Sequence, residues 1–148
     1  MVRLQFEWVE PLELVPSGYD LGHMTFVGDK GSCTSKGKTP DQAMMLILSF
    51  SDLLYGLRRI ATQQLDEYMF VGTDSSFIVK FRATSKGHVT VKCRDVIIDE
   101  VEIDSLCRSV LSDVQAFMAR PENLLPEDDL GQRDLAISIA SLVQAIAR

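Results

Sequence analysis

A segment in the first third of the chain carries residues typical of a phosphate-binding loop. Residues 32–39 read SCTSKGKT and end in the Gly-Lys-Thr with which the G-x-x-x-x-G-K-[ST] motif closes. Ser32 occupies the position of the first glycine, which in that motif lets backbone amides approach the phosphate closely. The acidic pair Asp99 and Glu100 follows an apolar run and could hold a magnesium ion, as in nucleotide-binding enzymes. A small nucleotide-dependent enzyme is therefore an alternative function, although the missing glycine favours an ordinary polar loop followed by a capped helix.

The cysteines could supply a reactive thiol. Cys33, Cys93 and Cys107 show no C-x-x-C spacing, so the sequence predicts neither a disulfide framework nor a zinc site. Cys33 lies in the polar segment 28–38, which we expect to be an exposed loop, and the lysines around it would favour its thiolate. We expect the other two cysteines to be buried. A thiol-dependent enzyme that uses the 28–39 loop is therefore a further alternative.

The two histidines do not indicate a metal site. His23 and His88 have no second ligand at a spacing typical of metal binding. We therefore predict no metal, and we assign no catalytic residue and no cofactor; a non-catalytic protein is favoured over the enzyme alternatives above.

A basic stripe follows from the register of one predicted hairpin. Residues 77–84 and 89–94 alternate between apolar and polar side chains, which predicts two half-buried strands. A three-residue loop over 85–87 sets Phe81 opposite Val91, whereas loops of two or four residues would set Phe81 opposite a lysine. This register places four cations on the outward face, with the two lysines directly opposite each other: Lys80, Arg82, Lys92 and Arg94. The stripe is either a solvated face balanced by an acidic strand or a surface for an anionic partner or ligand.

Carboxylates gather in two other parts of the chain, and we predict that they contact a protein partner. The residues are Asp95, Asp99, Glu100 and Glu102 in the first part and Glu127, Asp128 and Asp129 in the second. The formal net charge of −6 favours a basic partner over a nucleic acid. Solubilising surface is the alternative interpretation of these carboxylates.

The elements that would position these side chains follow from periodicity and turn signals. We expect strands over 2–9, 12–15, 21–27, 68–71, 77–84, 89–94 and 96–103, and helices over 52–64, 104–119 and from 129 or 134 to the end. A capping box at residues 39–42 would start a helix there, and 42–49 is either helix or buried strand. Because the strands come before most helices, we predict an α+β fold in two layers, a mainly antiparallel sheet with helices packed on one face.

Length and composition suit one cytoplasmic domain spanning residues 1–148. The chain has 148 residues, of which 46% are hydrophobic, and this is enough for a single core. Its longest apolar run, 43–48, is too short to cross a bilayer, and the first residues lack the pattern of a signal peptide. We therefore expect no membrane association.

Over most of its length the chain resembles the small bacterial immunity-type proteins that accompany polymorphic toxins, and uncharacterised domains found beside them. The resemblance lies in the early extended segments, the stretch 44–60, the hairpin 77–95 and the helix 106–117. It implies a protein that binds and blocks a toxin domain, often a basic nuclease, through an acidic surface and without catalytic residues. We therefore predict a non-catalytic, immunity-like protein-binding module. A homodimeric structural subunit, associated through the apolar residues 44–50, is the remaining alternative.

Overall fold

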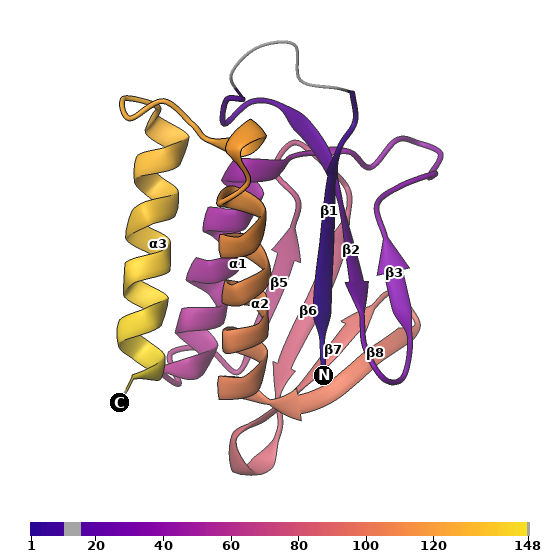
Figure 1. Ribbon diagram of the computed structural model, residues 1–148. Coiled ribbons are helices and arrows are strands. Elements are labelled where there is room, and N and C mark those ends of the chain that lie inside the picture. The colour runs from indigo at the N-terminus through magenta and orange to yellow at the C-terminus, as the bar shows by residue number, and fades with distance from the viewer. Residues whose placement is uncertain (11–15, 148) are drawn as a thin grey trace.

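Two antiparallel sheets and three helices make up the fold (Figure 1). The computed structural model describes residues 1–10 and 16–147, so the strand expected over 12–15 lies outside the described residues. One sheet has the order β1-β2-β3, with β4 also paired to β2: β1 (Arg3–Trp8), β2 (Leu21–Val27), β3 (Ser32–Thr34) and β4 (Met44–Met45). The other is a meander in chain order: β5 (Glu67–Val71), β6 (Ile78–Ala83), β7 (His88–Cys93) and β8 (Val96–Glu102).

The three helices lie beside the sheets in Figure 1, with α3 outermost. They are α1 (Leu46–Ala61), α2 (Ile103–Met118) and α3 (Leu130–Ile146), and short 3₁₀ turns occur at Ser85–Gly87 and Pro121–Asn123. Helix α1 contacts β5 and α3, while α2 contacts β1. The predicted α+β class, with antiparallel strands and helices packed against them, is confirmed.

The sheets and helices share one hydrophobic core. Phe26 of β2 lies with its ring centroid 6.5 Å from that of Phe70 and 6.1 Å from that of Phe81, both in the other sheet. Phe50 of α1 contacts Phe117 of α2 edge-on at 5.8 Å. The apolar stretch 44–50 supplies several fully buried side chains to this core. The stretch that we considered for a dimer interface therefore packs inside the monomer.

Helix α1 begins later than its predicted capping box. Residues 42–49 are divided between the two-residue strand β4 and the first turn of α1, which starts at Leu46. Met45 donates its backbone N–H to the Thr73 carbonyl at 3.0 Å, and Ser49 Oγ accepts the Thr73 N–H at 2.9 Å. The capping-box prediction was wrong: residues 39–43 form no helix, and pairing of Met44 and Met45 with β2 keeps the chain extended until α1 begins at Leu46.

The segment 28–38 is more ordered than the loop we expected. Within it, β3 pairs with β2 so that Cys33 lies opposite Phe26. The turn before β3 sits directly on β8, where Lys30 donates its N–H to the Ile98 carbonyl at 3.0 Å. A Cβ atom at Gly28 would lie 2.2 Å from that carbonyl oxygen, so this close approach requires glycine. The contact fixes β3 of the first sheet against the edge of the second.

The β6–β7 hairpin has the predicted register. Phe81 pairs with Val91 and Lys80 pairs with Lys92, and Gly87 adopts a φ of 74°. Strand β7 continues into β8 through a tight turn, since Cys93 pairs with Val96.

An ion pair joins α2 to β1. Asp113 of α2 is 8% exposed and accepts a 2.6 Å bond from Arg3 Nη2 and a 2.8 Å bond from the Leu4 N–H. Because both partners belong to β1, this carboxylate fixes the helix to the sheet edge.

Candidate functional site

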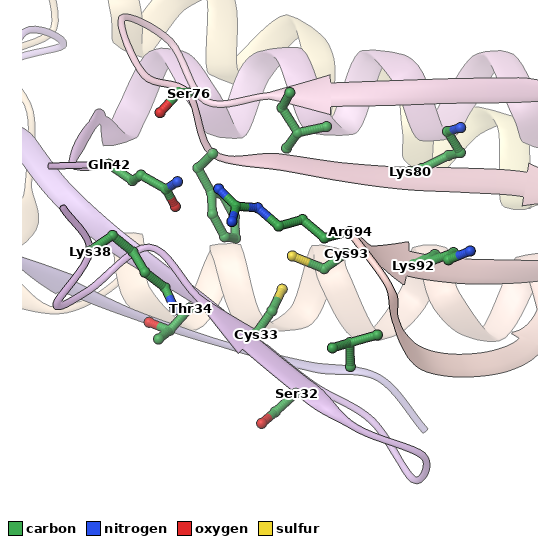
Figure 2. A pocket seen from close by; sticks show the side chains of 13 residues that line it. Ser32, Cys33, Thr34, Lys38, Gln42, Ser76, Lys80, Lys92, Cys93 and Arg94 are labelled. Atoms are coloured by element: carbon green, nitrogen blue, oxygen red, sulfur yellow. The ribbon is translucent and has the colours of Figure 1, made fainter. Parts of the chain in front are cut away.

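A pocket of about 430 Å³ opens between β3 and the β6–β7 hairpin (Figure 2). Its walls come from both sheets: β3 and the segment that follows it on one side, and β6, β7 and the β7–β8 turn on the other. The contact between Gly28 and β8 holds these two walls at a fixed separation.

Four cations line this pocket, and its lining contains no carboxylate: Lys38, Lys80, Lys92 and Arg94. Lys80 lies 3.8 Å from Glu67, a residue outside the pocket. Across residues 1–10 and 16–147, the other three form no ion pair. Positive charge is therefore concentrated at one place on a chain whose formal net charge is −6.

The predicted basic stripe is brought together in part. Lys80 and Lys92 are opposite each other as expected, but Arg94 lies in the turn after β7 with a φ of 53°. Figure 2 shows its side chain reaching back into the pocket. Arg82 instead lines a neighbouring depression of about 490 Å³, which it shares with Lys80, Lys92 and the carboxylate of Glu67. The sequence did not predict that Lys38 lines this pocket. The contact between Gly28 and β8 brings its segment close to the β6–β7 hairpin, and these parts are far apart in the sequence.

The amide of a largely buried glutamine also faces the pocket. Gln42 is 7% exposed, and Figure 2 shows its side-chain amide directed into the space near Arg94. In the described part of the chain this amide has no hydrogen-bond partner. Its amide atoms are therefore open to the pocket and available to a ligand.

Two of the cysteines meet in the same pocket. Figure 2 shows the sulfur atoms of Cys33, on β3, and Cys93, at the end of β7, pointing toward each other. A hydrogen bond from the Cys33 thiol lowers the pKa of Cys93 to about 7, with Arg94 and Lys38 acting in the same direction and burial opposing them. The same hydrogen bond, together with burial, raises the pKa of Cys33.

The sequence placed these cysteines differently. We expected Cys33 in an exposed loop and Cys93 as a packing residue, whereas both are half-buried and adjacent. Their contact forms between two sheets, so no local spacing indicates it. Cys107 is buried in α2 as expected, and burial raises its pKa to about 12.

The first predicted acidic cluster contains one structural carboxylate. Asp99 is 4% exposed, and its oxygens accept the N–H groups of Asp29 at 3.0 Å and of Glu100 at 2.8 Å. Glu100 lies 3.5 Å from Lys30, and Glu102 is exposed opposite His88. Asp95 is exposed in the β7–β8 turn. Only three members of this cluster therefore face solvent.

The second acidic cluster lies elsewhere. Asp129 accepts the N–H of Gln132 at 3.0 Å and so caps α3, with Glu127 and Asp128 exposed just before it. Figure 1 shows the loop before α3 at one end of the helices, away from β8. The two clusters are not brought onto one surface, and their predicted binding of a partner stays a prediction.

The phosphate-loop interpretation lacks its structural context. A phosphate loop joins a strand to the N-terminus of a helix, but residues 32–39 form β3 and a connection that continues to β4. The carboxylate of Asp99, considered for magnesium, already accepts backbone hydrogen bonds. Among the described residues, no three His, Cys, Asp or Glu side chains are grouped so that they could hold a metal ion.

Comparisons with known proteins give no relative. No protein-family model matches the chain, and neither a curated protein nor a solved structure matches it. Among the described residues, no helix combines the length and the apolar character needed to span a membrane.

Proposed function

We propose that the protein binds a small anionic ligand in the pocket between β3 and the β6–β7 hairpin. The observation that carries this proposal is the convergence of four cations on a pocket whose lining has no carboxylate. Lys80 and Lys92 face each other across a strand pair, an arrangement that weakens a sheet unless an opposite charge compensates it. Glu67 compensates Lys80 in part at 3.8 Å, and a bound anion would supply the compensation that Lys92 lacks.

The shape of the site favours a ligand with two negative groups. Lys38, Arg94 and Gln42 lie at one end of the pocket in Figure 2, and Lys80 and Lys92 lie at the other. Apolar side chains, Phe77 among them, also line the pocket. A volume of about 430 Å³ suits a small metabolite, because ligand pockets commonly measure about 300–1,000 Å³.

Calorimetric titration with a series of dicarboxylates tests this function. Acids from succinate to pimelate are compared with their neutral diamides, which have the same shape without the charge. We expect binding of the acids alone, with one preferred length, weakening as salt rises. Arg94→Gln should lower the affinity, and Arg133→Gln, at an exposed cation on α3, is the matched control. Equal binding of acids and diamides, or of neither, would contradict the proposal.

The protein-binding function predicted from the sequence is the second candidate. The exposed apolar residues Val96 and Ile97 favour it, because they lie on β8 with Asp95 and Glu100 close by in the chain. A basic protein could cover this mixed surface, since interfaces combine an apolar centre with a polar rim.

A charge-reversed variant separates the two functions. Glu100→Lys with Glu102→Lys should abolish capture of a basic partner from the host's extract while leaving anion binding intact. Asp99 is left unchanged because its carboxylate supports the backbone. Lys92→Gln is the reciprocal control, expected to weaken anion binding and retain the partner. Loss of the partner in both variants would argue against a separate acidic interface.

A further inference from the structure

The thiol pair adds chemistry to a pocket that otherwise only binds. Cys33 and Cys93 come from different sheets, yet their sulfur atoms face each other inside the lining of one pocket. Both sulfurs lie beside the end of the pocket that holds Lys38 and Arg94. A ligand held by those cations would present its atoms to the thiols.

We propose that Cys33 and Cys93 form a dithiol that exchanges with small disulfides carrying carboxylates, bound in this pocket. The inference rests on the proposed anion-binding function, since the cations select the substrate. Disulfides of this class meet both features of the site: negative groups for the cations and a sulfur–sulfur bond for the thiols.

The exchange takes two steps. In the first, the Cys93 thiolate attacks one sulfur of the substrate, the substrate's sulfur–sulfur bond breaks, and one thiolate leaves. The product is a mixed disulfide on Cys93. In the second, Cys33 attacks the Cys93 sulfur, the mixed disulfide breaks, and the second substrate thiolate leaves with the proton from Cys33. Two electrons pass to the substrate, which is reduced to two thiols, and the protein is oxidised to the Cys33–Cys93 disulfide.

The facing sulfurs show which thiols take part, and the direction of their pKa shifts assigns the two roles. Cys93 accepts the hydrogen bond from Cys33 and has two nearby cations, so its thiolate is the better populated one and the attacking group. A thiol whose pKa lies near the working pH is the most effective attacker. Once Cys93 is bound to the substrate, it no longer carries the negative charge that raises the pKa of Cys33. Cys33 is therefore easier to deprotonate after the first step than before it, although burial continues to raise its pKa.

Thiolate population alone gives a small advantage. With a pKa of about 7, about half of the Cys93 side chains are thiolate at pH 7, against about 3% for an ordinary cysteine. A thiolate of lower pKa is also a weaker nucleophile, and this cancels most of the gain. The net increase in the rate of attack is roughly threefold to fourfold. For an anionic substrate, attraction to the cations increases the exchange rate more than the thiolate population does. Two charges about 5 Å from a carboxylate at a wet surface change its binding by about tenfold.

The test uses the reduced protein and three disulfide probes of different charge. These are oxidised glutathione, which is anionic, bis(2-hydroxyethyl) disulfide, which is neutral, and cystamine, which is cationic. Acid-quenched samples are analysed by mass spectrometry, and each rate is divided by the rate of the same disulfide with a free thiol. We expect oxidised glutathione to react about tenfold faster than the neutral probe at low salt and to yield a Cys33–Cys93 disulfide.

Variants assign the steps. Cys33→Ser should stop at a mixed disulfide on Cys93, Cys93→Ser should react at least about tenfold more slowly, and Cys107→Ser should behave as the parent. Lys38→Gln combined with Arg94→Gln should slow both the anionic and the neutral probe, because both cations favour the Cys93 thiolate, and should slow oxidised glutathione by a larger factor, because only that probe also loses the attraction to the cations.

The outcomes separate this inference from the proposed function. If carboxylates bind by calorimetry while Cys33 and Cys93 stay reduced with every probe, the exchange proposal is overturned and the binding function stands. If the internal disulfide forms at equal relative rates with all three probes, selection of an anionic substrate by the exchange reaction is overturned, and calorimetry with dicarboxylates decides separately whether the binding function stands. A mixed disulfide that persists in the parent protein would overturn the role of Cys33.

Discussion

At the contact between α2 and β1, the buried carboxylate of Asp113 accepts bonds from Arg3 and from the Leu4 N–H. At the pocket, the 7% exposed Gln42 has no hydrogen-bond partner among the described residues, and Lys92 stands opposite a like charge. Both regions are rich in polar side chains, but only the first satisfies them from within the chain. Paired buried groups contribute to stability, whereas the pocket groups meet solvent and are available to a ligand. The comparison separates a structural polar contact from the one that we propose to bind a ligand.

Gly28→Ala should damage the pocket most severely and leave the α2–β1 contact in place. The added methyl would meet the Ile98 carbonyl at 2.2 Å and push the β2–β3 hairpin away from β8. We expect a loss of about 3 kcal/mol in the free energy of unfolding, measured by urea denaturation, together with loss of anion binding. Gly18→Ala is the control, because its nearest contact of 3.5 Å is ordinary. Retained binding in Gly28→Ala would show that the pocket does not depend on this contact.

Asp113→Ala should have the opposite profile. Removing the carboxylate leaves the Leu4 N–H unpaired, and we expect a loss of about 2 kcal/mol in stability with unchanged anion affinity. Asp134→Ala, at an exposed carboxylate on α3, should change stability by less than about 0.5 kcal/mol. A fall in anion affinity for Asp113→Ala, measured on protein that is still folded, would erase the distinction between the two regions.

Lys92→Gln should change stability and binding in opposite directions. It removes the like-charge pair with Lys80, so we expect a gain of up to about 0.5 kcal/mol in stability and a lower affinity for dicarboxylates. Thermal unfolding and calorimetry on the same preparation check both signs. If stability falls instead, the lysines are compensated within the chain and the comparison fails.

Cys33→Ala should have the smallest effect, which is a shift in the pH dependence of Cys93 alkylation. Alkylation of Cys93 by iodoacetamide should rise through a pH of about 7 in the parent, since the thiolate is the reactive form. Without the hydrogen bond from Cys33, the pKa of Cys93 rises and the profile moves to higher pH. Cys33→Ser restores a donor and should recover part of the shift. An unchanged profile in Cys33→Ala would remove Cys33 as the cause.

The fold was predictable where local chemistry decides it. The alternation in residues 77–94 and the need for a left-handed residue at Gly87 fixed the β6–β7 register from sequence alone. Helix α3 likewise starts where Asp129 offers a cap. The capping box at 39–42 had the same local signal, yet pairing of β4 with β2 overrides it.

Only one wall of the pocket was predictable from the sequence. The hairpin register placed Lys80 opposite Lys92, but the other wall belongs to a segment that we expected to be a loop. Two features decide the position of Cys33: pairing with Phe26 and the close approach of Gly28 to β8. Both join residues distant in the sequence, and neither leaves a periodic or spacing signal. The meeting of Cys33 with Cys93 could therefore not be read from the chain.

The placement of Cys33 and Cys93 on separate sheets has a consequence for how long the molecule survives. A covalent bond between them would close a loop of about 60 residues, and the chain-entropy relation assigns such a closure about 4 kcal/mol. The oxidised protein would then open far less often than the reduced one, and proteases act on the opened state. The protein would therefore be degraded more slowly in surroundings that keep the two thiols oxidised than in surroundings that keep them reduced.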